Sequence, residues 1–368
     1  MKHSIVPAPL RALPWTPVLL VFAIIAFSCV VLYSAAGGKP TPWALNQGIR
    51  FLVFFGLAVV LSRVPLRVWE TATFPLYAII LVLLVGVELI GAVKGGSQRW
   101  LNLGFMQLQP SEFMKVAIVL TIARFYSLLP SSQLRTITAL WPAALLIGLP
   151  VGLVMLQPDL GTALMIAGGG LTITFLAGLP LRLYVGAALA LAAAGPIVFS
   201  FMHEYQRNRV LIFLNPESDP LGKGYHISQS KIAIGSGGLT GKGWLQGTQS
   251  RLDYLPERQT DFVFATMAEE WGLAGGLFLI FAFFLLIRWG MLVAHRAKTK
   301  FARLTAAGLA TTIFFYVGIN LMMVMGLAPV VGIPLPLFSY GGSAVMTVMI
   351  CLGILMSIDR ESRRGRMP

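Results

Sequence analysis

Ten apolar stretches, each long enough to cross a lipid bilayer as an α-helix, divide this sequence. They cover about residues 15–36, 45–62, 70–92, 110–129, 138–156, 159–178, 181–201, 262–293, 303–327 and 335–358. A helix needs roughly 20 apolar residues to cross the hydrocarbon core, and these stretches lack the alternation of apolar and polar residues that a barrel strand needs. The sequence therefore predicts an all-α polytopic membrane protein with ten transmembrane helices.

The composition agrees with a single membrane domain over residues 1–368. Only 11% of the residues are charged and 57% are hydrophobic, whereas a soluble domain carries roughly 25% charged residues. The net charge of +14 would suggest nucleic acid in a soluble protein. In a membrane protein, the bias of basic residues toward cytoplasmic loops and an acidic lipid ligand account for it. We therefore expect no nucleic-acid partner.

The basic residues orient the chain in the membrane. Most of those near the ends of the apolar stretches fall on the side that also holds the N-terminus, and cytoplasmic loops are enriched in Lys and Arg. They are Arg63, Arg67, Arg135, Arg182, Arg296, Lys298, Lys300, Arg303, Arg360, Arg363, Arg364 and Arg366. This side is predicted to be cytoplasmic, and an even number of spans places both termini there.

The acidic residues gather at the opposite, outer face. Ten of the fourteen lie at or beyond the outer ends of the predicted helices, by our placement of the spans. The same face carries the long connection of about residues 203–261, between helices seven and eight. A connection of this length in a compact domain is usually functional. The chemistry is therefore expected at the extracytoplasmic face.

Two similar turns begin predicted helices on that face, and each carries a carboxylate. "LQPSE" ends at Glu112, and "LQPDLG" contains Asp159. Each acid alone fits the first turn of a helix, where a negative charge is stabilised by the helix dipole. With Lys115 one turn beyond Glu112, and Arg99 shortly before it, the set also fits a charged cavity between helices.

The outer connection is rich in cations. They are Arg207, Arg209, Lys223, Lys231, Lys242, Arg251 and Arg258. Such residues are usually solvated surface, yet an outer loop has no topological need for them, and Arg and Lys side chains suit a pyrophosphate headgroup. The glycines of "GSGGLTGKG" do not make a nucleotide-binding loop, because Ser236 and Gly243 occupy positions where that motif needs Gly and Ser or Thr. A flexible turn explains them more simply.

The segment "LPERQTDFVFATMAEEWG", residues 255–272, concentrates charge at a membrane boundary. Asp261 fits a first-turn acid, and it also fits a general base whose pKa is raised by burial and neighbouring acids, such as Glu257. Glu269 and Glu270 fall inside the apolar stretch and need a cavity or a partner. Near the last helix, "PLPLFSYGGS" suggests a broken start to that helix.

Several long motifs occur here in the order found in the SEDS family, named for shape, elongation, division and sporulation. They are "QRWLNLGFMQLQPSEFMK", "QPDLGTALM", "ESDPLGKGYH", "GKGWLQGTQS", "LPERQTDFVFATMAEEWG" and "PVVGIPLPLFSYGGS". The sequence closely resembles this family from about Trp15 to Ile358. The forms "ESDPLGKGYH" and "GKGWLQGTQS" favour its elongation-type branch over the similar division-type branch.

The resemblance implies a ten-helix enzyme of the bacterial cytoplasmic membrane that polymerises lipid II into peptidoglycan strands on the outer face. It implies a class B penicillin-binding protein as the crosslinking partner, within the elongation machinery. The family's essential aspartate falls on Asp261. Its other functionally sensitive positions fall on Arg99, Glu112, Lys115, Asp159 and Arg209. Gln259 departs from the histidine that relatives often carry.

The implied mechanism is a single inverting displacement. Asp261 would take the proton of the acceptor sugar 4-hydroxyl, which attacks C1 of the donor, and undecaprenyl pyrophosphate would leave. Its charge would be met by Arg and Lys of the outer connection, with a divalent cation (Mg²⁺ or Mn²⁺) as a further candidate whose ligands the sequence does not identify. No covalent carboxylate intermediate is required.

The sequence leaves three alternatives open. A lipid II flippase would use acids and broken helices within the membrane as a pathway, although here the acids gather at the outer face. A division-type polymerase of the same family is the second. A non-catalytic scaffold for the penicillin-binding protein is the third, and it leaves the buried acids unexplained.

Overall fold

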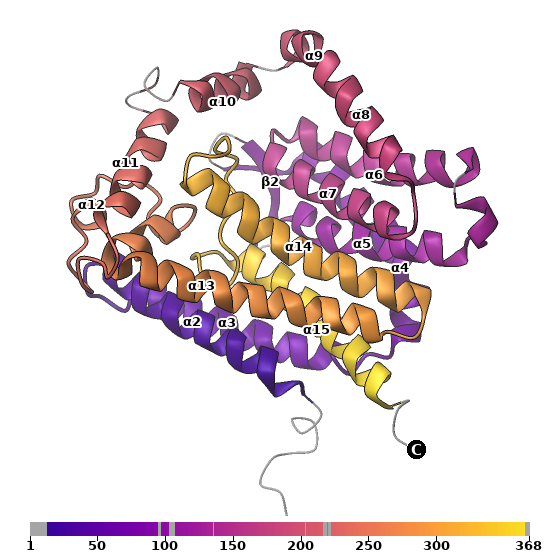
Figure 1. Cartoon of the computed structure of the whole chain (residues 1–368), viewed down its shortest axis with the longest axis horizontal. Helices are drawn as coiled ribbons and strands as arrows, with labels where there is room; N and C mark the ends of the chain where they lie inside the picture. Colours follow the sequence, from indigo (N-terminus) through magenta and orange to yellow (C-terminus); the bar gives the residue numbers. More distant parts are fainter. Residues whose placement is uncertain are drawn as a thin grey trace, which may run out of the picture.

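The computed structural model describes residues 13–94, 97–102, 107–134, 136–202, 204–215, 219 and 222–364. Of the residues used above for orientation, Arg135 and Arg366 lie outside these ranges. The helices are α2 (Trp15–Ala35), α3 (Trp43–Leu61), α4 (Leu66–Ile90), α5 (Pro110–Leu128), η1 (Ser131–Gln133), α6 (Ile137–Leu156), α7 (Leu160–Leu176), α8 (Leu181–Ala193), α9 (Gly195–Phe201), α10 (Glu204–Leu214), α11 (Lys223–Ser236), α12 (Thr248–Arg251), α13 (Val263–Arg296), α14 (Lys300–Val324) and α15 (Gly342–Arg364). Figure 1 shows their arrangement.

Every one of the ten apolar stretches contains a helix or a bent pair of helices. Within the described residues, seven helices are long and apolar enough to cross a membrane, and α8 with α9, bent by 54°, would make an eighth span. The other two stretches are α7, which is apolar but only 17 residues long, and α5, which carries three charged residues. A mostly helical, multi-span protein is therefore confirmed.

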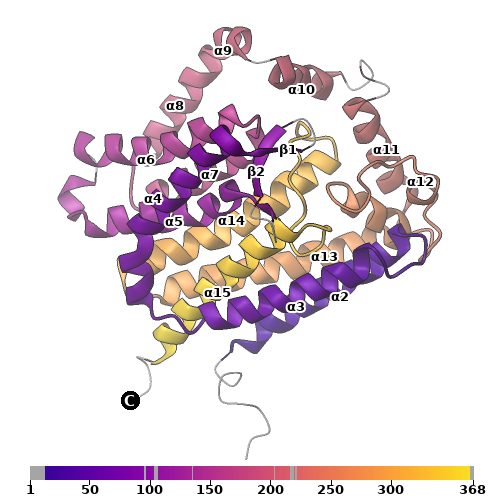
Figure 2. The ribbon, with the colours of Figure 1, turned by 180° about the vertical axis from the view of Figure 1, so that it is seen from behind.

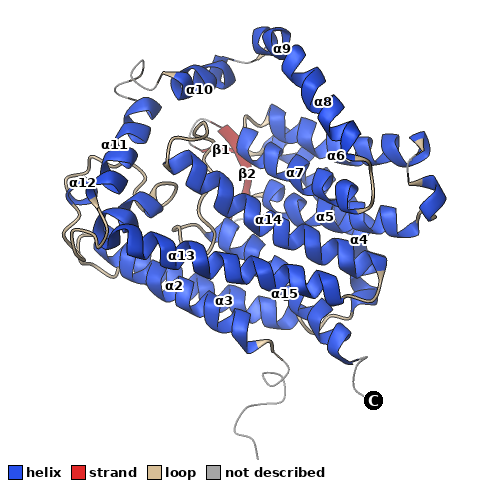
Figure 3. Ribbon diagram, in the orientation of Figure 1, coloured by secondary structure: helices blue, strands red, loops and turns tan. Residues whose placement is uncertain are grey.

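A small antiparallel sheet interrupts the helical pattern, so the expectation of an all-α fold was wrong at this point. Strands β1 (Ala92–Lys94), β2 (Ser97–Asn102) and β3 (Gln107–Leu108) lie in the order β1-β2-β3 between α4 and α5. The sheet is the one red element among the blue helices in Figure 3. The Gln98 side chain donates to the Val87 carbonyl at 3.0 Å and ties β2 to the end of α4.

The core lies where α5, α13, α14 and α15 pack together, with α2 and α3 alongside in Figures 1 and 2. Fourteen of the nineteen residues of α5 are buried, including Glu112 and Lys115. Its local sequence suits a helix start, with Pro110 at the first position and Glu112 in the first turn, where each is favoured. The most buried helix of this core is therefore also one that carries an ion pair.

The long outer connection is folded rather than irregular, which differs from the expected loop. It contains α10, α11 and α12, and with α8 and α9 it forms an arch beside the bundle in Figures 1 and 2. None of the residues of α8 is buried. Since α8 is mostly apolar after Arg182, its exposed surface suits contact with lipid.

The end of the bundle where α15 finishes is closed by contacts between the α3–α4 turn and the last turns of α15. Ser357 donates to the Val64 carbonyl at 2.6 Å, and Arg360 donates to the Arg63 carbonyl at 2.8 Å. The Leu66 amide donates to a Glu361 carboxylate oxygen at 3.2 Å. Several of the arginines assigned to the cytoplasmic side thus gather at one end of the molecule.

Candidate functional site

Asp261 lies two residues before α13, on backbone that α14 holds in place. The Nδ2 atom of Asn320 donates to the Asp261 carbonyl at 3.0 Å and to the Ile333 carbonyl at 2.7 Å. Asn320 is completely buried in α14. One buried amide therefore fixes the backbone of Asp261 against the segment that follows α14.

The "PLPLFSYGGS" segment holds the two residues before Asp261. The Ser339 hydroxyl donates to the Thr260 carbonyl at 2.6 Å, and the Tyr340 amide donates to the Gln259 carbonyl at 2.8 Å. Residues 325–341 form turns and irregular backbone, and α15 begins at Gly342. The predicted helix start at 335 was therefore wrong, while the predicted break was correct: these turns bind the segment that carries Asp261.

The Asp261 carboxylate is partly exposed and sits in a mixed electrostatic environment. Burial, the largest effect, and the nearby negative charge of Glu257 raise its pKa to about 6, although the positive charge of Arg209 lowers it. Burial and Glu257 together therefore change the pKa of Asp261 more than Arg209 does. At a pKa near 6 the carboxylate is ionised at neutral pH and still has an appreciable affinity for a proton, which suits a general base.

Arg50 is a neighbour of this site that the sequence analysis missed. It lies within α3, and its guanidinium stacks over the Tyr340 ring with 4.6 Å to the centroid. No carboxylate among the described residues forms an ion pair with it. The sequence carried a signal for it, because an arginine inside an apolar stretch is costly and is usually functional. Arg50 was not predicted, because the cations of the outer connection were already sufficient to explain pyrophosphate binding.

Glu112 and Lys115 form a closed, buried ion pair. Lys115 Nζ lies 2.6 Å from Glu112 Oε1 and donates to the Tyr316 hydroxyl at 2.8 Å. Tyr316 and Thr347 each donate to Glu112 Oε2, at 2.5 and 2.9 Å. Glu112 is 5% exposed and Lys115 2%. These contacts join α5, α14 and α15, so the pair links three core helices.

Arg99 and Asp159, predicted near the same face, also come together. Arg99 Nη1 lies 3.8 Å from Asp159 Oδ2, and Arg99 donates to the carbonyls of Gln157, at 3.1 Å, and Pro158. Asp159 accepts from the Thr162 amide at 3.2 Å as the N-cap of α7. The interpretation of Asp159 as a helix start is thus confirmed, and β2 is anchored to it through Arg99.

Glu269 and Glu270 fasten the outer connection onto α13. Glu269 Oε1 accepts from Lys242 Nζ at 2.7 Å and from the Thr248 amide at 2.8 Å, at the start of α12. Glu270 accepts from the Ser34 hydroxyl at the end of α2. Both glutamates are buried, at 0% and 1% exposure. Their partners are therefore the connection and a neighbouring helix.

The glycine-rich segment crosses α13 at close range. Gly272 interrupts α13 with φ 61° and ψ −158°, and a Cβ there would lie 2.4 Å from the Gly241 nitrogen. The amides of Lys242 and Gly243 donate to the carbonyls of Glu269 and Glu270, at 3.0 and 3.1 Å. The glycines allow the backbone of the connection to approach the backbone of α13 closely. The amides of Lys242 and Gly243 are used in these hydrogen bonds.

The remaining cations of the connection fall into two groups. Arg207 donates to the Phe199 and Ser200 carbonyls at 3.4 and 3.3 Å, and Arg258 forms an ion pair with Asp253 and stacks over Trp43. Arg251 donates to the Leu245 carbonyl at 2.6 Å, so all three are engaged within the fold. The exposed Lys231 lies against Gly326 at the end of α14. Lys223 is the first residue of α11, and its side chain is outside what the structure describes.

No group of three or more His, Cys, Asp or Glu side chains within the described ranges is placed to hold a metal ion. The site therefore consists of Asp261 with Glu257 and Arg209 near it, and Arg50 is linked to it through Tyr340 and Gln259. The three polar clusters of Glu112, Asp159 and Glu269 position the helices and the connection that surround it.

Known proteins resemble the chain over almost its whole length. The cell cycle protein family of FtsW, RodA and SpoVE matches residues 12–364. The peptidoglycan glycosyltransferase MrdB of Escherichia coli K12 is 49% identical over 351 residues, covering 95% of this chain and 94% of the relative.

Two solved structures share the fold. A chain of a peptidoglycan synthase complex that coordinates polymerization and crosslinking has a TM-score of 0.83 at 34% identity, covering 95% of this chain and 98% of that one. The rod shape determining protein RodA of Thermus thermophilus has a TM-score of 0.72 at 31% identity, covering 95% and 97%. The likeness thus includes both the sequence and the arrangement of the helices.

Proposed function

The chain belongs to the FtsW, RodA and SpoVE family of cell cycle proteins and is a peptidoglycan glycosyltransferase of the elongation type; from this premise we propose that Asp261 is the general base of lipid II polymerisation. The observation that carries the proposal is the state of this carboxylate. Its pKa lies near 6, and no group among the described residues donates a hydrogen bond to its two oxygens. A carboxylate with these properties is available to a substrate proton.

The proposed reaction is one displacement with inversion. The carboxylate of Asp261 takes the proton of the acceptor sugar 4-hydroxyl while that oxygen attacks C1 of the donor. The bond between C1 and the pyrophosphate oxygen breaks, and undecaprenyl pyrophosphate leaves with the electron pair. The donor is α-linked and the product β-linked, so a single displacement accounts for the stereochemistry. General base catalysis of this kind contributes typically 10²–10⁴-fold.

Arg209 and Arg50 are the cations we assign to the pyrophosphate. Arg209 is close enough to lower the pKa of Asp261, and Arg50 stacks on Tyr340, whose amide binds the Gln259 carbonyl two residues before Asp261. Guanidinium groups bind phosphate oxygens through paired hydrogen bonds. Lys223 and Lys231, both in α11, stay candidates for the same role.

The other predicted substrate-binding residues are better assigned to positioning. Glu112 with Lys115, Arg99 with Asp159, Lys242 with Glu269, and Arg207 and Arg258 all have partners within the protein. A buried charge that loses its partner is strongly destabilising, and the buried members of this set are Glu112, Lys115, Asp159 and Glu269. Substitutions at these positions would therefore reduce activity through the fold around Asp261.

An apolar pocket of about 330 Å³ between α11 and α13 suits the polyprenyl chain of the substrate. Phe264, Leu277 and Ile280 line it, together with the Gly272 break. It begins next to the start of α13, close in sequence to Asp261.

We assign ten spans, cytoplasmic termini and an extracytoplasmic site to the protein, because this arrangement places the basic end of the bundle inside the cell.

A class B penicillin-binding protein of the elongation machinery is the proposed partner. The similar chain from the synthase complex belongs to an assembly that coordinates polymerization and crosslinking. A polymerase that releases uncrosslinked strands outside the membrane needs such an activity beside it.

Lipid II translocation is the alternative that the sequence left open, and one experiment separates it from polymerisation. The purified full-length protein and a class B penicillin-binding protein are reconstituted in vesicles with labelled lipid II. We expect glycan strands to form on the accessible face, and strand length and lipid translocation are measured together. Translocation without any strands would overturn the proposal in favour of the flippase.

A further inference from the structure

A groove of about 570 Å³ opens at the end of the molecule opposite to Asp261. It lies between the start of α2, the last turns of α13 and the end of α15, and three arginines line it: Arg288, Arg296 and Arg363. Arg296 ends the 34-residue α13, which begins two residues after Asp261. At 1.5 Å per residue this is about 50 Å of helix, so the groove is separate from the catalytic site.

The groove carries uncompensated positive charge. Arg363 is paired with Asp359 at 2.8 Å. Arg288 and Arg296 are exposed, and neither has an ion pair with any residue in the part of the chain that the structure describes. Two guanidinium groups are therefore available to an acidic ligand. Their five N–H donors each suit phosphate oxygens.

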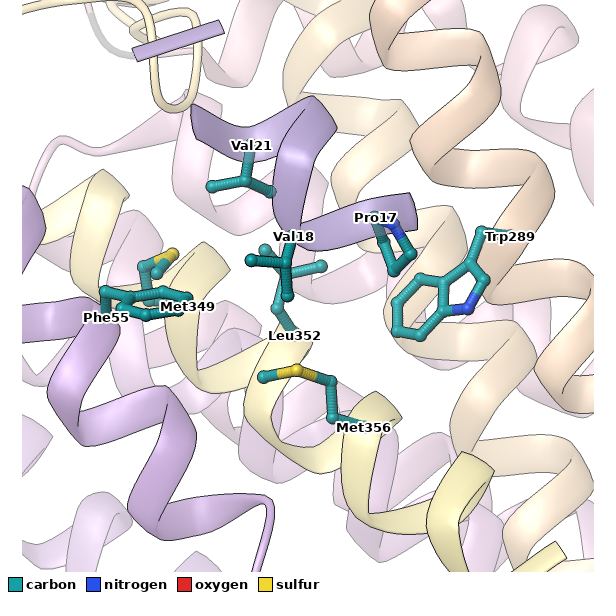
Figure 4. A pocket seen from close by; sticks show the side chains of 8 residues that line it. All are labelled: Pro17, Val18, Val21, Phe55, Trp289, Met349, Leu352 and Met356. Atoms are coloured by element: carbon teal, nitrogen blue, oxygen red, sulfur yellow. The ribbon is translucent and has the colours of Figure 1, made fainter. Parts of the chain in front are cut away.

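The rest of the groove is apolar and aromatic. Trp15, which is 46% exposed, and Trp289 both line it, and tryptophan is enriched at the boundary between lipid and water. Figure 4 shows Trp289 and Pro17 at the edge of an adjoining crevice that has a volume of only about 10 Å³. Such a crevice holds at most about one water molecule, so an apolar tail would lie along the outside of the bundle.

We propose that this groove binds the headgroup of an acidic phospholipid, with its acyl chains along α2 and α13. Basic pockets between transmembrane helices on the cytoplasmic side bind such headgroups. The chain's own residues 1–12 are a poor occupant, because they contain Lys2 and Arg11 and no acidic residue. The inference goes beyond the proposed function and depends on it only for the membrane placement of this end.

The test uses the purified full-length protein in mixed micelles that contain dioleoyl phosphatidylglycerol and dioleoyl phosphatidylcholine in equal amounts. Native mass spectrometry measures which lipid stays bound. The variant Arg288→Gln/Arg296→Gln removes both free charges. The matched control, Arg67→Gln/Arg303→Gln, removes two exposed arginines that do not line the groove.

We expect the wild type and the control to prefer phosphatidylglycerol. In the double groove variant this preference should fall about 25-fold, since each basic residue contributes about fivefold near an acidic headgroup. Added inorganic phosphate should leave the lipid bound. An unchanged preference in the groove variant would overturn the proposal, as would equal losses in both variants. Displacement by phosphate would show an anion site in place of a lipid site. Lipid II polymerisation checks that both variants are folded.

Discussion

The electrostatics of Asp261 can be tested by changing one neighbour at a time. Glu257→Gln removes a negative charge that raises the pKa of Asp261, and Arg209→Gln removes a positive charge that lowers it. Because a general base must be ionised, polymerisation should rise with pH through the pKa, near 6 in the wild type. We expect the acid limb to move to lower pH in Glu257→Gln and to higher pH in Arg209→Gln. The pH profile of kcat/KM measures both, and shifts of the same sign would contradict the account.

The buried pair of Glu112 and Lys115 gives a second prediction at the residue scale. Lys115→Met leaves Glu112 as a buried carboxylate without its cation, which costs about 3–5 kcal/mol in comparable pairs. The double variant Glu112→Gln/Lys115→Met should recover much of this loss. Thermal unfolding in detergent measures all three proteins. A stable Lys115→Met with lost activity would instead favour the substrate-binding role.

Sequence reasoning proposed Asp261 and two charged residues near it, Glu257 and Arg209, but not Arg50. Asp261 could be proposed because it lies where a cationic connection meets an apolar helix, and because the essential aspartate of the family falls on it. Arg50 could not be joined to it, since the contact runs through Tyr340, nearly 300 residues further along the chain. Whether burial, Glu257 or Arg209 dominates also depends on distances that a sequence does not contain.

At the scale of elements, the break in α13 at Gly272 determines how the outer connection is attached. Gly272→Ala places a Cβ at 2.4 Å from the Gly241 nitrogen, on backbone with φ 61°. The strain costs about 1–3 kcal/mol even without the clash, so we expect a lower Tm and faster hydrogen exchange over residues 238–252. Gly276→Ala is the control, because its nearest neighbour, Phe264, is 3.6 Å away. Equal exchange in both variants would contradict this attachment.

Most of the helices could be predicted from the apolar stretches, because the membrane requires length and hydrophobicity. The sheet of β1–β3 could not, since β1 and β3 have three and two residues, too few for alternation to show, and the six residues of β2 lie between apolar helices that dominate the pattern. The helices α10 and α11 were missed for a related reason. Their polar residues matched a loop. Only the packing of α11 against α13 and α14 reveals its helical face, and α10 contacts α11.

At the scale of the whole molecule, the ten-span arrangement that we propose assigns each connection to a side of the membrane. In a variant with Cys29 and Cys351 replaced by serine, single cysteines at Leu239, Ser132 and Lys298 test three connections. A membrane-impermeant thiol reagent should label position 239 in intact cells, and positions 132 and 298 only after permeabilisation. Labelling of position 132 in intact cells would show that α5 or one of the preceding helices does not cross the membrane.

The most direct test of the account is strand synthesis by Asp261→Asn. This substitution keeps the size of the side chain and removes its ability to take a proton. Purified wild type, Asp261→Asn and Glu257→Gln, each with the penicillin-binding protein, are compared on labelled lipid II at pH 7.5. We predict a loss of at least about 10²-fold for Asp261→Asn, the usual contribution of a general base, with Glu257→Gln retaining activity. Strand formation by Asp261→Asn at the wild-type rate would contradict the assignment of Asp261 as the base.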